Sequence, residues 1–199
     1  MFFKSLNNLS KKATFKEATI KGIAPDKGLY YPTEINTLSK SFIKNLNSLS
    51  LNEVAYEAIN QFIGDSIPEN QLRNIINETL VFDFPLIEIE KNIFSLELFH
   101  GPTLAFKDVG ARFMARCLSY FNQNSEEKIT VLVATSGDTG GAVADGFYGV
   151  KGVEVVILYP KGKISSIQEK QMTTLGNNIT ALEVDGVFDD CQDMVKKAF

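Results

Sequence analysis

The sequence has few of the residues on which metal sites and histidine-dependent nucleophiles rely. Its 199 residues include one histidine, His100, and two cysteines, Cys117 and Cys191. A single histidine excludes most zinc-site templates and any catalytic triad that needs a histidine elsewhere in the chain. The cysteines lie far apart without a C-x-x-C spacing, which is typical of reduced thiols, and we expect Cys117 to lie in the core. Chemistry therefore has to come from lysine, aspartate, serine and backbone groups.

Long apolar runs and blocks of basic residues are also missing. The longest apolar runs last a handful of residues, far fewer than the ~20 that a membrane span needs. The 20 basic and 24 acidic residues give a net charge of -4 without a basic block, so we expect no nucleic-acid partner. The first residues contain no signal-peptide core. These absences predict a cytoplasmic protein that acts on a small molecule.

The composition is that of an ordinary globular protein. Hydrophobic residues make up 44% of the chain and charged residues 22%, which is enough apolar content for a sizeable core. The length corresponds to one full domain with a smaller part, or to a piece of something larger.

Residues 1–90 are predicted to be mainly helical. Apolar side chains at helical spacing predict a helix over 52–62. The segment Ile67-Pro68-Glu69 then opens a second helix that ends near Thr79. Both helices carry an apolar face that needs a partner.

From about residue 91, strands alternate with helices. The expected strands are 93–99, 129–134, 153–159 and 179–184, and the expected helices are 106–121, 142–147, 165–175 and 188–199. Because the later strands are uninterrupted apolar runs, the pattern predicts an α/β fold with a buried parallel sheet and flanking helices.

The segment from His100 to Asp108 carries the first candidate for catalysis. Lys107 opens a predicted helix, where the positive end of the macrodipole favours the neutral, nucleophilic amine over the ammonium ion. Phe106 beside it would exclude water. The alternative is that Lys107 merely starts a surface helix on which Asp108 and Arg112 form an ion pair. We expect His100 to be a hydrogen-bonding loop residue.

The second candidate segment is 135–141, which follows a predicted strand and opens a helix. Its glycines let the backbone approach a ligand, and its hydroxyls and N–H groups suit an anion at the carboxyl end of a parallel strand. We therefore expect a carboxylate or a phosphate to bind here. The alternative is a tight turn with Asp138 or Thr139 as the N-cap. The spacing matches neither the dinucleotide nor the P-loop fingerprint.

Together, the segments 98–108 (LFHGPTLAFKD) and 134–140 (ATSGDTG) closely resemble the two signature segments of the threonine synthase family. These are pyridoxal-phosphate enzymes of the tryptophan-synthase-β type. The resemblance runs through the chain and includes 16–30 and 156–165. It implies the type II fold of pyridoxal-phosphate enzymes, with 1–90 as the N-terminal segment typical of threonine synthases and 91–199 as the start of the α/β cofactor domain.

The resemblance also implies a reaction and a site. In this family O-phosphohomoserine and water become threonine and phosphate, a carbon–oxygen lyase reaction that completes threonine biosynthesis. Lys107 would hold pyridoxal 5'-phosphate as a Schiff base and would later shuttle protons among the substrate carbons. Asp138 stands where many relatives of this fold have an asparagine near the cofactor's 3'-oxygen. The residues implied at the site are Lys107, Phe106 and Asp138 for the cofactor, and Ser136, Gly137 and Thr139 for the substrate carboxylate.

Two other interpretations stay open. Another enzyme of the same fold, such as a serine or threonine dehydratase or a cysteine synthase, shares the lysine and the Ser-Gly-x-Thr-Gly loop, although the helical region before residue 90 argues against it. A non-catalytic fragment would use the glycine loop only to turn the chain. Family members are longer, and their phosphate-binding loop lies beyond residue 199, so we expect the 199-residue chain alone to be inactive. The sequence leaves the oligomeric state open.

Overall fold

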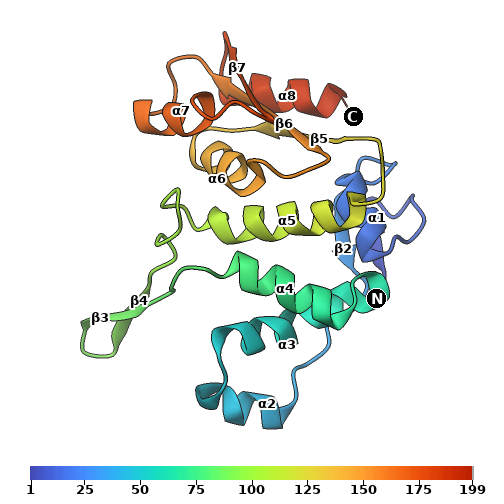
Figure 1. The fold of residues 1–199 in the computed structure, drawn as a ribbon, viewed down its shortest axis with the longest axis vertical. Coiled ribbons are helices and arrows are strands. Elements are labelled where there is room, and N and C mark those ends of the chain that lie inside the picture. Colours follow the sequence, from blue (N-terminus) through green and yellow to red (C-terminus); the bar gives the residue numbers. More distant parts are fainter. Residues whose placement is uncertain (199) are drawn as a thin grey trace. The chain divides into compact units, whose positions relative to one another are not determined.

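The computed structural model of the protein describes residues 1–198 and divides into two compact units, 1–80 and 81–199 (Figure 1). The sequence pattern places this division later, at about residue 90. The strand from 86 to 90 pairs with the strand that follows it, which places both in the second unit. No helix within residues 1–198 is both long enough and apolar enough to cross a membrane.

The first unit consists of helices and a two-stranded antiparallel sheet. The sheet pairs β1 (Phe3–Ser5) with β2 (Tyr30–Pro32). Its helices are α1 (Phe15–Lys21), α2 (Lys40–Asn45), η1 (Leu46–Ser48), α3 (Leu51–Ile63), η2 (Gly64–Ser66) and α4 (Glu69–Thr79). The two predicted helices are confirmed as α3 and α4. The small sheet was not predicted, because three-residue strands are too short to show an alternating pattern.

Helices α3 and α4 bury the apolar faces that their spacing predicts. Tyr56 and Ile63 are the buried residues of α3, and Leu72, Ile75 and Ile76 are buried on α4. The two helices pack against each other. Mutual burial of two amphipathic faces stabilises this part of the unit.

Asp26 joins two loops of the first unit. Its carboxylate accepts hydrogen bonds from the Ser5 hydroxyl at 2.6 Å and from the N–H groups of Leu9 and Gly28 at 2.9 and 3.1 Å. The Ser5 hydroxyl, with smaller contributions from these N–H groups, lowers the pKa of Asp26 to about 2. The folded state therefore stabilises the charged form of the Asp26 carboxyl group relative to the unfolded state.

We expect this carboxylate to make the stability of the first unit depend on acid pH. Its contribution is present above the unfolded pKa of about 3.9 and is lost as the pH falls toward about 2. Asp26→Asn should lower the midpoint of thermal unfolding at pH 7 and flatten its dependence between pH 5 and pH 2. Asp65→Asn changes an exposed aspartate of the same unit and is the control. Equal pH profiles for the Asp26 variant and the parent would contradict the assignment.

The second unit is an α/β fold. Its three-stranded sheet, in the order β5-β6-β7, is parallel throughout. The strands are β5 (Ile129–Ala134), β6 (Val153–Pro160) and β7 (Ile179–Val184), and the helices are α5 (Lys107–Asn122), α6 (Asp138–Phe147), α7 (Ser166–Thr173) and α8 (Phe188–Ala198). The predicted parallel sheet with flanking helices is confirmed. The part of the last expected helix at residue 199 lies outside the described residues.

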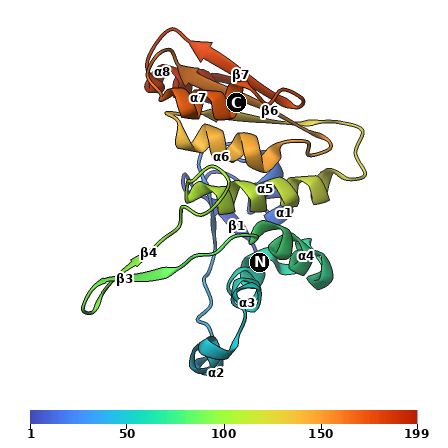
Figure 2. The ribbon, with the colours of Figure 1, turned by 60° about the vertical axis from the view of Figure 1, so that its left-hand side comes forward.

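A hairpin of β3 (Leu86–Glu90) and β4 (Ile93–Leu96) precedes this sheet. It extends away from the rest of its unit in both views (Figures 1 and 2). The strand expected over 93–99 is confirmed in its first four residues only, since the chain leaves the hairpin after Leu96.

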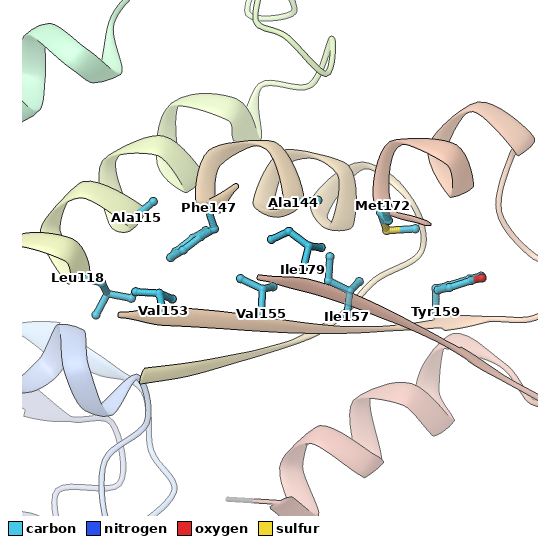
Figure 3. Packing of buried hydrophobic residues seen from close by; sticks show 10 residues of the cluster. All are labelled: Ala115, Leu118, Ala144, Phe147, Val153, Val155, Ile157, Tyr159, Met172 and Ile179. Atoms are coloured by element: carbon cyan, nitrogen blue, oxygen red, sulfur yellow. The ribbon is translucent and has the colours of Figure 1, made fainter. Parts of the chain in front are cut away.

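The core of the second unit lies between the sheet and one layer of helices. Helices α6 and α7 cover one face, with α5 packed against α6, and α8 lies on the opposite face (Figure 3). The buried cluster comprises Ala115, Leu118, Ala144, Phe147, Val153, Val155, Ile157, Tyr159, Met172 and Ile179. A Cβ on Gly146 would lie 3.0 Å from the carbonyl carbon of Ala111, so glycine permits the close approach of α5 and α6. This contact joins the last turn of α6 to the first half of α5.

Cys117 is buried in α5, as predicted. Burial raises the pKa of its thiol to about 12. The thiol is therefore protonated at neutral pH and is a packing residue, not a nucleophile.

Candidate functional site

The two candidate segments meet at the beginnings of α5 and α6. Lys107 is the first residue of α5, and Asp138 is the first residue of α6, four residues after the end of β5. The Nζ atom of Lys107 lies 3.8 Å from Oδ2 of Asp138. The two side chains are 33% and 58% exposed. An ion pair as exposed to solvent as this one adds little to the stability of the fold. What matters for chemistry is that it places an amine beside a carboxylate.

Phe106 does not have the surroundings that the sequence pattern predicts. The Lys107 ammonium lies 4.7 Å from the centroid of the Phe106 ring, a cation–π contact. Phe106 is 61% exposed, however, so within the described residues it does not exclude water from the lysine. The prediction of a water-excluding phenylalanine is wrong for this part of the protein, because the ring lies beside the amine at the surface.

Asp108 ties the loop before α5 to the first turn of the helix. It is 1% exposed, and its carboxylate accepts hydrogen bonds from the N–H of Thr103, at 3.0 Å, and from the Thr103 hydroxyl. A Cβ on Gly101 would lie 2.4 Å from the carboxylate, which explains the glycine. These contacts hold the segment before Lys107 in one conformation.

The alternative in which Asp108 pairs with Arg112 is wrong. Arg112 lies 3.6 Å from Asp145 of α6, because Asp108 turns toward Thr103. Burial raises the pKa of Asp145, and Arg112 partly offsets this rise. His100 pairs with Glu97 at 2.7 Å, which confirms it as a hydrogen-bonding loop residue.

Thr135 shapes the loop between β5 and α6. Its side chain is 1% exposed, and its hydroxyl oxygen accepts hydrogen bonds from the N–H groups of Gly137 at 3.0 Å and Gly140 at 2.8 Å. This role of Thr135 was not predicted from the sequence. The signal that could have revealed it is a hydroxyl residue directly after a buried strand and just before a glycine-rich helix start.

Helix α6 begins four residues earlier than its apolar pattern predicts. It starts at Asp138, and its N-cap is Gly137, with a φ of 138° that favours glycine. The alternative with Asp138 or Thr139 as the N-cap is therefore wrong. The side chain of Thr135 satisfies the N–H of Gly140, one of the two that an N-cap side chain would otherwise bind.

Three N–H groups of this loop remain available. Among the described residues, those of Ser136, Asp138 and Thr139 have no recorded acceptor, whereas the N–H of Gly137 is committed to Thr135. They lie at the N-terminus of a ten-residue helix that follows a parallel strand. This is a favourable position for an anion.

A cavity of about 450 Å³ adjoins these groups. Lys107 and Thr139 contribute its polar side chains, and its walls are otherwise apolar, with Met114, Val133 and Val143 among them. A mainly apolar hollow with a few polar groups is typical of a small-molecule site. Lys107 and Thr139 thus place an amine and a hydroxyl at the wall of one largely apolar space, and the Asp138 carboxylate lies 3.8 Å from that amine.

Comparison with known protein families identifies the class. Residues 76–199 match the family described as pyridoxal-phosphate dependent enzyme, and the chain belongs to this family. Residues 2–80 match the family described as the threonine synthase N terminus. Within the class, the chain is therefore similar to the N-terminal portion of threonine synthases.

Individual relatives agree with this assignment. The chain is 47% identical over 198 residues to threonine synthase of Buchnera aphidicola subsp. Baizongia pistaciae, covering 98% of this chain and 46% of the relative. It is 43% identical over 195 residues to threonine synthase of Escherichia coli (strain K12), covering 98% and 45%. The chain thus spans less than half the length of these relatives.

Solved structures confirm the fold. The crystal structure of threonine synthase from Escherichia coli matches with a TM-score of 0.92 and 42% identity, covering 100% of this chain and 46% of that chain. A pyridoxal-phosphate-bound threonine synthase from Brucella melitensis matches with a TM-score of 0.89 and 38% identity, covering 100% and 44%. The expected type II fold of pyridoxal-phosphate enzymes is confirmed by these matches.

Proposed function

We propose that this chain is the N-terminal part of a threonine synthase, a lyase that converts O-phosphohomoserine and water to threonine and phosphate with pyridoxal 5'-phosphate. The observation that carries the proposal is the meeting of Lys107 and Asp138 beside the apolar cavity. Similarity to threonine synthases over 98% of the chain supports the choice of this reaction over a dehydratase or a cysteine synthase.

The residues around the cavity fit pyridoxal phosphate. Lys107 would hold the cofactor through its amine, which is the group that reacts with an aldehyde. Phe106 and Asp138 lie beside that amine and would complete the cofactor contacts from this chain. The apolar walls suit a flat aromatic ring. When bound, the cofactor stores the negative charge that develops on a substrate carbon after a proton has been removed.

Lys107 can transfer protons within the site. A neutral amine accepts a proton from carbon, and the resulting ammonium ion can return it to a neighbouring carbon. The Asp138 carboxylate faces the ammonium form. The position of Lys107 at the first turn of α5, fixed by the Asp108 contacts, aims the amine at the cavity that it lines.

The loop 136–139 would bind the α-carboxylate of the substrate. The free N–H groups of Ser136, Asp138 and Thr139 supply donors, and Ser136 and Thr139 add hydroxyls. Gly137 would contribute through its backbone conformation. Because Thr139 also lines the cavity, a carboxylate held by this loop would lie next to the space that holds the cofactor.

Thr139→Val preserves the shape of the side chain and removes one donor. In the full-length protein we expect it to weaken ligands that carry an α-carboxylate by about tenfold, the cost of one hydrogen bond to a charged group. The affinity for inorganic phosphate should stay nearly constant. Thr173→Val on α7, where the hydroxyl bonds to the carbonyl of Glu169, is the matched control. Loss of phosphate binding alone would assign the loop to the other anion.

The direct test is an assay of the full-length protein. Purified protein, with and without pyridoxal phosphate, is given O-phosphohomoserine, and release of phosphate and threonine is measured. We expect cofactor-dependent release of both products and no comparable turnover of serine, threonine or O-acetylserine with sulfide. Residues 1–199 assayed in parallel should show no turnover. Preferred turnover of one of the alternative substrates would contradict the proposed reaction.

A further inference from the structure

Helix α7 begins with a capping box that differs from the others in the chain. Helices α1 and α3 start with capping boxes completed by Glu17 and Glu53. In α7 the same position is Gln168, whose Oε1 accepts hydrogen bonds from the N–H of Ser165 at 3.3 Å and from its hydroxyl at 3.0 Å. A glutamine completes the cap with its oxygen alone. Its NH₂ group is therefore available for another partner.

That partner is Asp138. The Nε2 atom of Gln168 donates a hydrogen bond to Oδ1 of Asp138 at 2.5 Å, across 30 positions of sequence. The other carboxylate oxygen, Oδ2, lies 3.8 Å from Nζ of Lys107. Gln168 thus binds one oxygen of the carboxylate while the second faces the lysine, and the contacts form a series from the N-terminus of α7 to Lys107.

The loop before α6 is shaped to admit this amide. A Cβ on Gly137 would lie 2.4 Å from Oε1 and 2.7 Å from Nε2 of Gln168, so any other residue at 137 would displace the glutamine side chain. Gln168 is only partly exposed, whereas Asp138 is an exposed side chain in the first turn of α6. Among the described residues, the polar side chains that contact the Asp138 carboxylate are those of Gln168 and, at 3.8 Å, Lys107. Loss of the amide would therefore leave the lysine alone to orient the carboxylate.

We propose that Gln168 is a positioning residue, which holds the Asp138 carboxylate in the orientation that faces Lys107. The inference rests on the function proposed above. A glutamate at 168 would serve the cap as well as Glu17 and Glu53 serve theirs, but it has no hydrogen to donate and would place a second carboxylate against Asp138. The requirement for a donor toward Asp138 explains the amide.

The test separates the cap from the positioning bond with three variants of the full-length protein loaded with pyridoxal phosphate. Gln168→Glu keeps the cap and removes the donor. Gln168→Met removes both without adding charge. Ser165→Ala removes the cap and keeps the amide of Gln168. Glu53→Gln makes the opposite exchange in the capping box of α3 and is the control.

Three measurements are made on each variant: kcat and KM for phosphate release, the visible circular dichroism of the bound cofactor, and the midpoint of thermal unfolding. For Gln168→Glu and Gln168→Met we expect kcat to fall about tenfold, KM to change by less than about twofold, and the dichroic band to weaken. Gln168→Glu keeps the capping box, so any lowering of its unfolding midpoint reports the lost bond to Asp138 and the added charge. Ser165→Ala should unfold about 2 °C lower and keep kcat and the dichroic band.

The outcomes distinguish this proposal from the proposed function. If either Gln168→Glu or Gln168→Met shows the same kcat and the same dichroic band as Ser165→Ala, then Gln168 only caps α7 and the proposal is overturned. A loss confined to Gln168→Glu would identify repulsion by the added charge and would also overturn it. If the parent protein has no bound cofactor at Lys107, the proposed function itself fails.

Discussion

Replacing Lys107 by alanine in the full-length protein is expected to abolish both turnover and the visible absorbance of the bound cofactor. The amine is the group of this chain that can bond to an aldehyde at the cavity, and it is also the group placed to move protons. Loss of both roles should lower kcat by about 10³-fold or more. Phosphate release and the absorbance spectrum of the purified variant measure the two effects separately.

Two further variants make this result specific to the amine. Lys107→Arg keeps a positive charge near Asp138 but has no amine that deprotonates in a protein, so it should be as inactive as the alanine variant. Lys128→Ala removes an exposed lysine of the same unit that pairs with Glu154, and it should behave as the parent. Reduction with borohydride followed by peptide mapping locates the attached cofactor. Attachment at a residue other than Lys107, or turnover by the alanine variant, would refute the assignment.

The α/β part of the fold could be predicted because its strands are short, mainly apolar runs that alternate with helices. The runs 129–134 and 179–184 are mainly apolar and bounded by turn residues, and the strands occupy the predicted positions. The start of α6 could not be predicted in the same way. Its first turn contains two glycines and no large apolar residue, so it shows no helical periodicity, although the Thr135 hydroxyl stabilises it.

The candidate site was predictable where its residues are adjacent in sequence and not where they meet through the fold. The segments with Lys107 and Asp138 stand out as an unusual lysine and a glycine-rich turn, and the structure brings them together. The bond from Gln168 to Asp138 spans 30 positions and leaves no local pattern. Similarly, the exposure of Phe106 depends on what packs around it, which neighbouring residues in the sequence do not specify.

Thr135→Val is expected to disrupt the loop between β5 and α6 although the two side chains have nearly the same shape. The Thr135 hydroxyl is the acceptor for the N–H groups of Gly137 and Gly140, and both glycines are buried. Valine would leave two buried donors without an acceptor, at a cost of about 1–3 kcal/mol for each. The free energy of unfolding of the full-length protein, measured with denaturant, should therefore fall by about 3 kcal/mol.

The same substitution should also impair anion binding, because the conformation of Gly137 orients the N–H groups of Ser136, Asp138 and Thr139. We expect ligands with an α-carboxylate to bind more weakly to Thr135→Val than to Thr139→Val, since the first change disturbs several donors and the second removes one. Thr135→Ser keeps the hydroxyl, loses only a methyl group and should retain most of the stability and affinity. If Thr135→Val were as stable as the serine variant and bound these ligands as tightly, the hydroxyl would not hold the loop.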